Sequence, residues 1–464
     1  MFFIVLDLRL IKVGLSGALF YVRKTAEHIN NLKYNDRTFL IKHYLCAANS
    51  EVKMQQRIHT FIIYILLCCF ICPCIQATEQ QTPPEDDGIR FSLLTCGPGT
   101  DIYALFGHTA LRYENRMRGI DAVFNYGLFS FDTPNFVLRF TLGETYYQLG
   151  ATTYKHFLSE YQMTNRDVWQ QTLNLSSEEK QRLIALLEEN YRPENRVYLY
   201  NFFHDNCSTR PRDLVEQVVE GRLHYANDMK TTDTDHSFRD IVHECCQGHP
   251  WSQLGIDFCL GSEADRPISR HQMMFAPLYL KDFFATATLA DSTGTHTTPL
   301  VSDTEQVVSA SDKNEEDSFP IPGPLTCALL LLAVISATTW YGLHKGKSLW
   351  GIDLTLFLMA GLSGCILAFL SFFSQHPAVG SNYMLFVLHP LHLFCLPCML
   401  RKVIRKQKSY YMMVNLAVLT LFIVLWAIIP QKINLAVLPL ALCLLVRSAG
   451  NLILSHKQAT KQKK

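Results

Sequence analysis

A histidine and a cysteine in this sequence have the surroundings that nucleophilic catalysis by a thiol requires. His108 lies in the short apolar segment 106–112, and Cys207 lies in the polar segment 206–209, which opens a stretch with the pattern of a helix. A thiol at a helix N-terminus near an imidazole is typical of a thiolate nucleophile, because the helix end favours the anion and the imidazole can hold or move the proton. Cys207 is therefore a candidate nucleophile and His108 a candidate general base.

Other interpretations of both residues stay open at this level. Many cysteines are buried for structural reasons, but the polar neighbours of Cys207 and two nearby arginines argue against that role. The first amides of the following helix are also expected to be free to stabilise a thiolate or an oxyanion. A zinc site would need more cysteine or histidine ligands at close spacing. A single histidine in an apolar strand is usually structural, yet Gly107 beside His108 permits close approach of the backbone.

A third polar group should orient the imidazole. Asn125, on the next predicted strand, is our first candidate, and Asp121 is the second because it also suits a turn. His204 and Asp205 are close to the thiol in sequence, but polar residues beside a chain reversal are more often turn formers than catalysts.

Residues 89–285 are predicted to form one α+β domain that positions these groups. Alternating apolar residues predict strands at 90–94, 108–113, 122–126 and 197–203, the last of which leads directly to the cysteine. Ser176 and Glu179 have the spacing of a capping box, and Pro211 falls in the first turn of the helix after Cys207, where proline is tolerated. Segment 286–323 is rich in Ser, Thr, Asp and Glu, which predicts a flexible tether.

The C-terminal third of the chain has the composition of a membrane domain. The protein has 464 residues, a formal net charge of +1 that gives no indication of nucleic-acid binding, and 48% hydrophobic residues. Five apolar runs, each close to the roughly 17–25 residues that cross a bilayer, lie at 324–343, 352–373, 383–400, 412–429 and 433–454. Lys and Arg concentrate after the first, third and fifth runs, the last being the basic tail 456–464, which predicts that these segments are cytoplasmic. The domain before residue 324 should therefore lie outside.

The N-terminus agrees with export. Arg57 precedes an apolar run and Ala77 ends a stretch of small residues, so 54–77 is predicted to be a secretory signal peptide. Residues 1–53 make little sense as a mature segment, and we interpret them as an extension upstream of a true start at Met54. An uncleaved anchor is the alternative interpretation.

Cysteine usage singles out one thiol in the exported domain. Its cysteines are Cys96, Cys207, Cys245, Cys246 and Cys259. In an oxidising compartment an odd number leaves one thiol unpaired, and Cys207 is our candidate.

Two polar residues of the membrane region need an interpretation. His376 lies in a short outward loop between the second and third runs, where a histidine is usually interfacial. Arg447 lies inside the fifth run near its cytoplasmic end, and snorkelling of its side chain explains it without a function.

The order of these elements resembles a known enzyme architecture. A histidine on a strand, a polar residue on the next strand and a cysteine at a helix start resemble the circularly permuted papain-like enzymes. Segments 95–99, 106–112, 200–213 and 255–261 are similar to the Lnb family, the bacterial lipoprotein N-acyltransferases with an exported N-terminal domain. The membrane helices are similar too, with Asn382 in an outward loop, so the resemblance covers residues 89–455.

The resemblance implies a papain-like exported domain followed by five transmembrane helices in a bacterial inner membrane, with the domain in the periplasm. It implies that Cys207 is the nucleophile and His108 the general acid/base, and Asn125 stays our candidate for the orienting group. For a phospholipid acyl donor, Arg210 or Arg212 is a candidate to hold the phosphate, with a solvated helix face as the alternative interpretation of both, and His376 is a candidate for the lipid side of the site.

The implied reaction transfers an acyl chain through a thioester to the N-terminal amine of a diacylglyceryl lipoprotein, with no cofactor and no metal. Two alternatives stay open. One is a membrane-anchored cysteine peptidase or amidase that acts on cell-wall peptides. The other is a non-catalytic binding protein with Cys207 in a disulfide.

Overall fold

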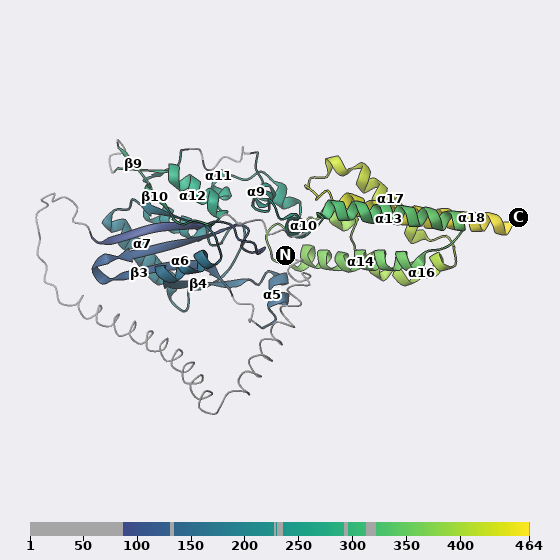
Figure 1. Ribbon diagram of the computed structural model, residues 1–464, viewed down its shortest axis with the longest axis horizontal. Coiled ribbons are helices and arrows are strands. Elements are labelled where there is room, and N and C mark those ends of the chain that lie inside the picture. The colour runs from purple at the N-terminus through teal and green to yellow at the C-terminus, as the bar shows by residue number, and fades with distance from the viewer. Residues whose placement is uncertain are drawn as a thin grey trace, which may run out of the picture. The chain divides into compact units, whose positions relative to one another are not determined.

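An antiparallel sheet is the scaffold of the N-terminal half of the computed structural model, which describes residues 87–129, 134–226, 229, 235–291, 296–311 and 322–463 (Figure 1). Its strands, all joined by antiparallel pairing, are β1 (Ile89–Cys96), β2 (His108–Asn115), β3 (Ile120–Leu128), β4 (Tyr146–Thr153), β5 (Val168–Leu173), β6 (Val197–Leu199) and β10 (Val301–Val308). Their order across the sheet is β10-β5-β1-β2-β3-β4-β6. The α+β class is confirmed, while the predicted strand 197–203 is shorter than expected. The predicted signal peptide 54–77 and the segment 1–53 lie outside the described residues.

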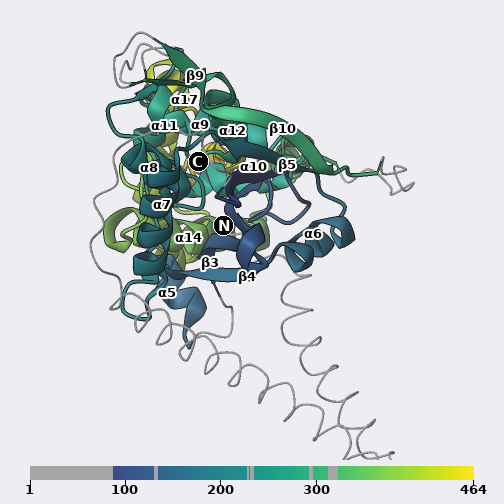
Figure 2. The same cartoon turned by 90° about the vertical axis from the view of Figure 1, so that its left-hand side faces the viewer.

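Each face of the sheet is covered by helices, as the alternation of side chains along the strands requires. Phe91 and Leu93 of β1 pack with α7 (Ser177–Tyr191), α8 (Thr209–Val218) and α12 (Pro277–Thr286). Leu94 and Ala110 pack on the opposite face with α6 (Tyr154–Met163), and Figure 2 shows α6 on the side of the sheet away from α7 and α8. Because Cys96 pairs with His108 in register, His108 lies on the α6 face.

The local signals at two helix starts are confirmed. Ser176 and Glu179 form the predicted capping box at the start of α7, with the Ser176 hydroxyl accepting from the Glu179 amide and the Glu179 carboxylate accepting from the Ser176 amide. Pro211 lies in the first turn of α8. The remaining helices of this half are α5 (Phe136–Leu142), α9 (Phe238–Cys245), α10 (Pro250–Cys259) and α11 (Arg270–Met273), with the 3-10 turns η2 (Arg116–Arg118) and η3 (Ser262–Asp265).

The predicted flexible tether 286–323 is corrected over most of its described residues. Within it, β8 (Thr288–Ala290) pairs with β7 (Leu223–His224) and with β9 (Thr297–Pro299), and β10 pairs with β5. β10 is an edge strand whose central residues are exposed on both faces. Its polar composition is that of an exposed edge, which composition alone does not distinguish from a linker.

The membrane region has fewer continuous spanning helices than predicted. Three helices are long and apolar enough to cross a bilayer, namely α13 (Pro324–Lys345), α14 (Trp350–Phe373) and α18 (Val437–Lys463), and the last absorbs the predicted basic tail. The third run is broken into η4 (Tyr383–Phe386), α15 (Leu391–Phe394) and α16 (Leu396–Ile404), with a bend of 76°. Pro390 and Pro397 cannot donate helix hydrogen bonds, and both fall at starts of these pieces. The fourth run is the shorter α17 (Tyr410–Val424) followed by η5 (Trp426–Ile428), so the region has three spans, or four if the bent pair counts as one.

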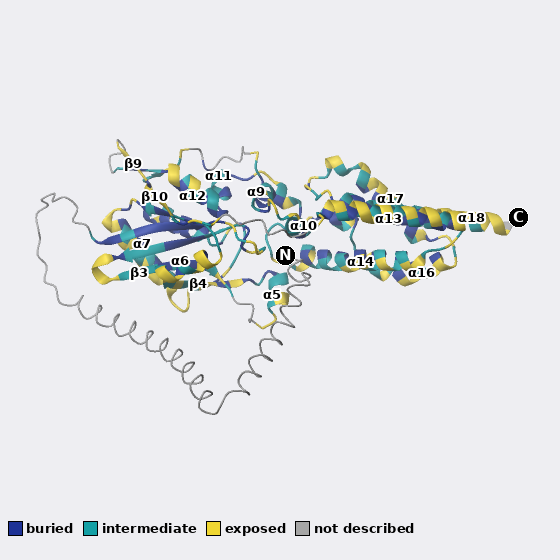
Figure 3. Cartoon of the chain, viewed as in Figure 1, coloured by how far each residue is buried: buried dark blue, intermediate teal, exposed yellow. Residues whose placement is uncertain are grey.

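Arg447 does not snorkel as predicted. Its guanidinium binds both carboxylate oxygens of Asp353 at 2.7 and 2.8 Å and donates to the Thr339 hydroxyl at 2.9 Å, while Asn451 donates to the same carboxylate at 3.0 Å. Both charged side chains are buried, and Figure 3 shows buried, intermediate and exposed residues interspersed along the membrane helices. The ion pair therefore joins α13, α14 and α18 inside the membrane region, where a charge needs a partner.

A seam of backbone contacts joins the N-terminal half to the membrane region within the unit Asp87–Lys464. The Gly261 amide donates to the carbonyl of Ala378 at 2.8 Å, and Asn382 donates to the carbonyl of Phe258 at 3.0 Å. A Cβ on Gly261 would overlap the carbonyl oxygen of Gly380. The end of α10 and the loop after α14 thus meet backbone to backbone, and only glycine fits at 261.

Substituting Gly261 should weaken this seam. Gly261→Ala is expected to destabilise the folded protein by about 1–3 kcal/mol, because the added methyl overlaps backbone that cannot move freely. Unfolding of the detergent-solubilised protein in denaturant measures this. Gly351→Ala, at a helical glycine with open space around it, is the matched control and should not destabilise the protein. Equal midpoints for the two variants would contradict the close approach.

Candidate functional site

His108 begins β2 in a position that requires glycine before it. Gly107 has φ +80°, and a Cβ there would lie 2.5 Å from the carbonyl oxygen of Cys96. The Nε2 atom of His108 lies 3.2 Å from Oδ1 of Asn125, while Nδ2 of Asn125 donates to the carbonyl of Val123 at 3.5 Å. Because an amide oxygen only accepts, Nε2 carries the proton and Nδ1 is left as the basic atom. Asn125 therefore lies where an orienting group should lie.

The start of α8 is held by a buried asparagine. Oδ1 of Asn206 accepts from the amides of Ser208 at 2.8 Å and Thr209 at 2.9 Å. Its Nδ2 donates to the carbonyls of Phe202 at 2.8 Å and Phe275 at 2.9 Å. The expectation that the first helix amides are free for an oxyanion is therefore wrong for Ser208 and Thr209, because the preceding side chain already caps them.

The beginning of β2 and the beginning of α8 touch directly. The hydroxyls of Thr109 and Ser208, both buried, lie 2.8 Å apart. The backbone amide of Thr109 also hydrogen-bonds to the thiol of Cys207. The β2–β3 pairing reaches only to Ala110, so this amide is left for the sulfur. The structure thus brings the residue next to His108 onto Cys207.

Burial disfavours the charged forms of both Cys207 and His108. Burial raises the pKa of the Cys207 thiol, although hydrogen bonds from Thr109, from its own amide and from Ser208, together with the charge of Arg166, act in the opposite direction. Burial lowers the pKa of His108 to about 4, and Arg166 adds to this while the bond to Asn125 opposes it. For the Cys207 thiol, desolvation therefore outweighs the stabilisation of the anion that the helix end was expected to give.

Four thiols of the N-terminal half form no disulfide in the structure. They are Cys96, Cys207, Cys245 and Cys246. Cys207 is partly exposed, whereas burial raises the pKa of Cys96 to about 12. Cys207 is thus available for chemistry rather than held in a disulfide.

The predicted arginines have protein partners. Arg210 forms a two-pronged ion pair with Asp205 and lies over the ring of Tyr198, 3.6 Å from its centroid. Arg212 is buried, pairs with Asp213 and donates to the carbonyl of His271 at 3.0 Å. A phosphate would have to compete with these contacts, so binding by either arginine stays a prediction.

The other candidates lie elsewhere. Asp121 binds Arg112 through both carboxylate oxygens, at 2.8 and 2.9 Å, rather than His108. His204 is exposed, and His376 hydrogen-bonds to the carbonyl of Phe140 in α5.

Two side chains near the thiol were not identified as candidates from the sequence. Arg166 donates from Nε to the carbonyl of Gly97 at 2.9 Å and acts on the pKa values of both His108 and Cys207. Its buried Nη2 has no hydrogen-bond partner among the described residues. The hydroxyl of Tyr198, equally without a partner there, is affected by the charge of Cys207. The glycine-rich segment 95–99, which receives Arg166, was the available signal.

One group of side chains has the spacing of metal ligands. Asp213, Glu216 and His271 place ligand atoms within 4.8 Å of one another. Glu216 accepts from Tyr225 at 2.6 Å and contacts His271 at 3.1 Å, while Asp213 pairs with Arg212. These contacts satisfy the group without an ion.

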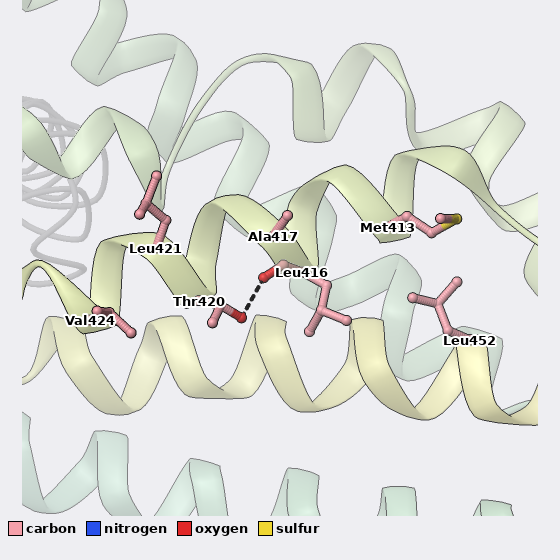
Figure 4. Close-up of a pocket in the computed structure, with 7 residues that line it drawn as sticks. All are labelled: Met413, Leu416, Ala417, Thr420, Leu421, Val424 and Leu452. Carbon is pink, nitrogen blue, oxygen red and sulfur yellow. Dashed lines mark hydrogen bonds between the residues drawn. The ribbon is translucent and has the colours of Figure 1, made fainter.

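An open apolar groove lies in the membrane region, away from the thiol. Figure 4 shows it between α17 and α18, lined by Met413, Leu416, Ala417, Thr420, Leu421, Val424 and Leu452. The Thr420 hydroxyl donates to the carbonyl of Leu416 at 2.7 Å and so adds no free polar group. Lipid tails in a bilayer suit such a surface, and it offers no group for chemistry.

Comparison with known proteins yields two family matches. A family model described as the Lnb N-terminal periplasmic domain matches residues 83–241. A second, described as the Lnb transmembrane domain and named for five transmembrane helices, matches residues 314–459. No curated protein matches. No solved structure matches, so the papain-like topology stays a prediction.

The buried hydroxyl of Tyr198 makes a test of the site. An unsatisfied buried hydroxyl costs about 1–3 kcal/mol, so Tyr198→Phe should raise the free energy of unfolding by about 1 kcal/mol. Tyr126→Phe is the control, because the Tyr126 hydroxyl accepts from Asn190 at 2.9 Å and its loss should destabilise. Denaturant unfolding in detergent measures both, and an equal loss in the two variants would show that Tyr198 has a partner.

Proposed function

Since this chain belongs to the Lnb family and is a membrane protein with a periplasmic N-terminal domain, we propose that it is a lipoprotein N-acyltransferase of a bacterial inner membrane. It moves an acyl chain from a phospholipid to the N-terminal cysteine amine of a diacylated lipoprotein. Cys207 carries the chain as a thioester, and His108 is the general acid/base. The observation that carries this proposal is the contact of Thr109 with both Cys207 and Ser208, which sets the thiol beside the strand of His108.

The first half-reaction forms the thioester. The thiol proton of Cys207 passes to Nδ1 of His108 as the sulfur attacks the ester carbonyl of the phospholipid. The bond between the carbonyl carbon and the alcohol oxygen then breaks. The alcohol oxygen takes the proton from His108, and the lysophospholipid leaves.

The second half-reaction transfers the chain to nitrogen. The amine of the lipoprotein attacks the thioester carbonyl while His108 takes a proton from it. The carbon–sulfur bond breaks, and the proton returns to the sulfur of Cys207. The product is an amide, and the thiol is restored.

The electrostatics of the site suit a neutral ground state. A neutral thiol and a neutral imidazole avoid the cost of a buried ion pair at rest, and charge develops only as the proton moves. The amides of Thr109 and Cys207 lie at the sulfur and can stabilise negative charge there. Burial of the site also limits hydrolysis of the thioester by water.

Arg166 is the cation best placed to meet the donor phosphate. Arg210 and Arg212 hold their charges in ion pairs with Asp205 and Asp213. Arg166 instead has a buried Nη2 atom without a partner among the described residues, and its charge reaches the reacting pair. A guanidinium is the group that binds phosphate most specifically.

The two alternative functions are less well supported. A peptidase or amidase needs the same pair, but several apolar helices exceed what an anchor requires. A binding protein with Cys207 in a disulfide conflicts with the free thiol.

The thioester is directly testable by mass. Full-length protein incubated with phosphatidylethanolamine vesicles, without acceptor, should gain one acyl chain that hydroxylamine removes. Cys207→Ala should gain none, because the nucleophile is missing, whereas Cys245→Ser should behave as the unmodified protein. Intact mass spectrometry reads all three, and an adduct that persists in Cys207→Ala would refute the proposed route.

The low pKa of His108 predicts the acid limit of acylation. His108 accepts a proton only when it is neutral, so activity is present above its pKa and lost below it. The rate of acylation by p-nitrophenyl butyrate should fall with an apparent pKa of about 4 rather than near 6.5. Circular dichroism over the same pH range checks that the fold persists, and an inflection between pH 6 and 7 would contradict a desolvated imidazole.

A further inference from the structure

A continuous row of aromatic rings runs from the membrane region to the thiol. It begins at Phe140 of α5 and continues through Phe136, Phe129 and Tyr147 to Tyr200. Successive ring centroids are 5.7, 6.1, 4.9 and 4.6 Å apart. The row thus connects a short helix, the end of β3, strand β4 and the segment that leads to Cys207.

The inner end of the row adjoins the sulfur. A Cβ built on Gly127 would lie 3.3 Å from the ring of Tyr200 and 3.7 Å from the Cβ of Cys207. Burial raises the pKa of Tyr200, and the charge of Cys207 adds to that rise. Gly127, with φ +86°, leaves the space between ring and thiol unfilled.

The outer end of the row adjoins the end of a membrane span. The ring of Phe140 packs edge-on against His376, with centroids 5.2 Å apart, in the loop that follows α14. The amide of Gln375 donates to the carbonyl of Leu142 at 2.8 Å, and Figure 1 shows α5 beside this end of α14. The row therefore starts where α14 ends.

Apolar side chains around this entrance are exposed. Val137 and Leu138 of α5 are 53% and 56% exposed, and Phe372 and Phe373 of α14 are 73% and 68% exposed. Exposed apolar side chains next to a membrane span suit contact with lipid. A cavity along the path is lined by four rings of the row and by Tyr146, and its rim also holds Thr145 and the ion pair of Arg139 and Glu144.

We propose that this row, from Phe140 to Tyr200, is the binding site of the fatty acyl chain, and that it guides the chain from the bilayer to Cys207. The inference rests on the proposed acyl transfer. Flat apolar rings bind a hydrocarbon without requiring hydrogen bonds, and burial keeps Tyr147 neutral by raising its pKa to about 12. The predicted contribution of His376 then is to hold α5, and with it Phe140, at the entrance.

Photo-crosslinking tests where the chain lies. Full-length protein in vesicles is irradiated with a phosphatidylethanolamine that carries a diazirine along its acyl chain, and the labelled peptides are identified. Label on segments 136–140 and 146–147 is expected. Label confined to the groove of α17 and α18 would overturn the proposal.

Chain-length selectivity tests what the rings do. Acylation of Cys207 is compared between the long-chain phospholipid and p-nitrophenyl butyrate. The ratio of the two rates should fall at least about tenfold in Phe136→Ala, because a long chain loses an apolar contact that a short one does not use. Phe136→Leu, which keeps the bulk, should fall less, and Phe394→Ala, at an exposed phenylalanine of α15, should keep the ratio.

The outcomes separate the two proposals. An unchanged ratio in folded Phe136→Ala overturns the acyl path even if Cys207 is acylated. Label on the path without any adduct on Cys207 supports the path and refutes the transfer through a thioester. If Phe136→Ala does not fold, the crosslinking of the unmodified protein decides alone.

Discussion

The contact between Thr109 and Ser208 is the constraint on which the site depends. The hydrogen bond of 2.8 Å between their buried hydroxyls joins strand β2 to the first turn of α8. Each residue follows a predicted catalytic residue by one position, so the contact holds the start of β2 against the start of α8. Asn206 supports it from behind, since its side chain satisfies two helix amides and two distant carbonyls at once. Because all these groups are buried, removing any one would leave others without partners.

The seam to the membrane region rests on a second buried network. Arg239 is fully buried and binds Asp257 at 2.7 Å and Asp265 at 2.9 Å. Its Nη2 atom also donates to the carbonyls of Leu260 and Gly261, the backbone that receives the membrane loops. A buried guanidinium whose three nitrogens all donate hydrogen bonds is held rigidly. Loss of one acidic partner leaves part of its charge uncompensated. The seam therefore fixes how the N-terminal half is joined to the membrane region.

Local sequence patterns predicted the positions of strands and helices well. The features that were not predicted depend on contacts between residues far apart in the sequence. Strands β1 to β3 and the capping box of α7 follow from alternation and residue type. The rise in the pKa of Cys207 could not be foreseen, because burial of this thiol depends on the packing of the whole domain. Arg447 was read as snorkelling because its partner Asp353 lies far away in sequence. β10 was taken for a linker because an exposed edge strand has the composition of one.

The candidate site shows the same division between local and distant information. His108, Asn125 and Cys207 were predictable from residue type and order, and the structure places the first two in contact. Arg166 was not predictable from the sequence, since its side chain acts on the thiol only because the ends of β1 and β5 meet in the fold.

A thioester in this site would face competition between an amine and water, and the architecture favours the amine. The neutral histidine and thiol attract little water at rest, and the aromatic row offers few polar atoms to hold any. An acyl chain lying on those rings would fill the space through which water could approach the carbonyl. The lysophospholipid leaves without the transferred acyl chain. The site would therefore retain that chain and release the rest of the donor lipid. Retention of the chain and exclusion of water would then be the same physical contact, made where the ring of Tyr200 and the Cβ of Cys207 both adjoin Gly127.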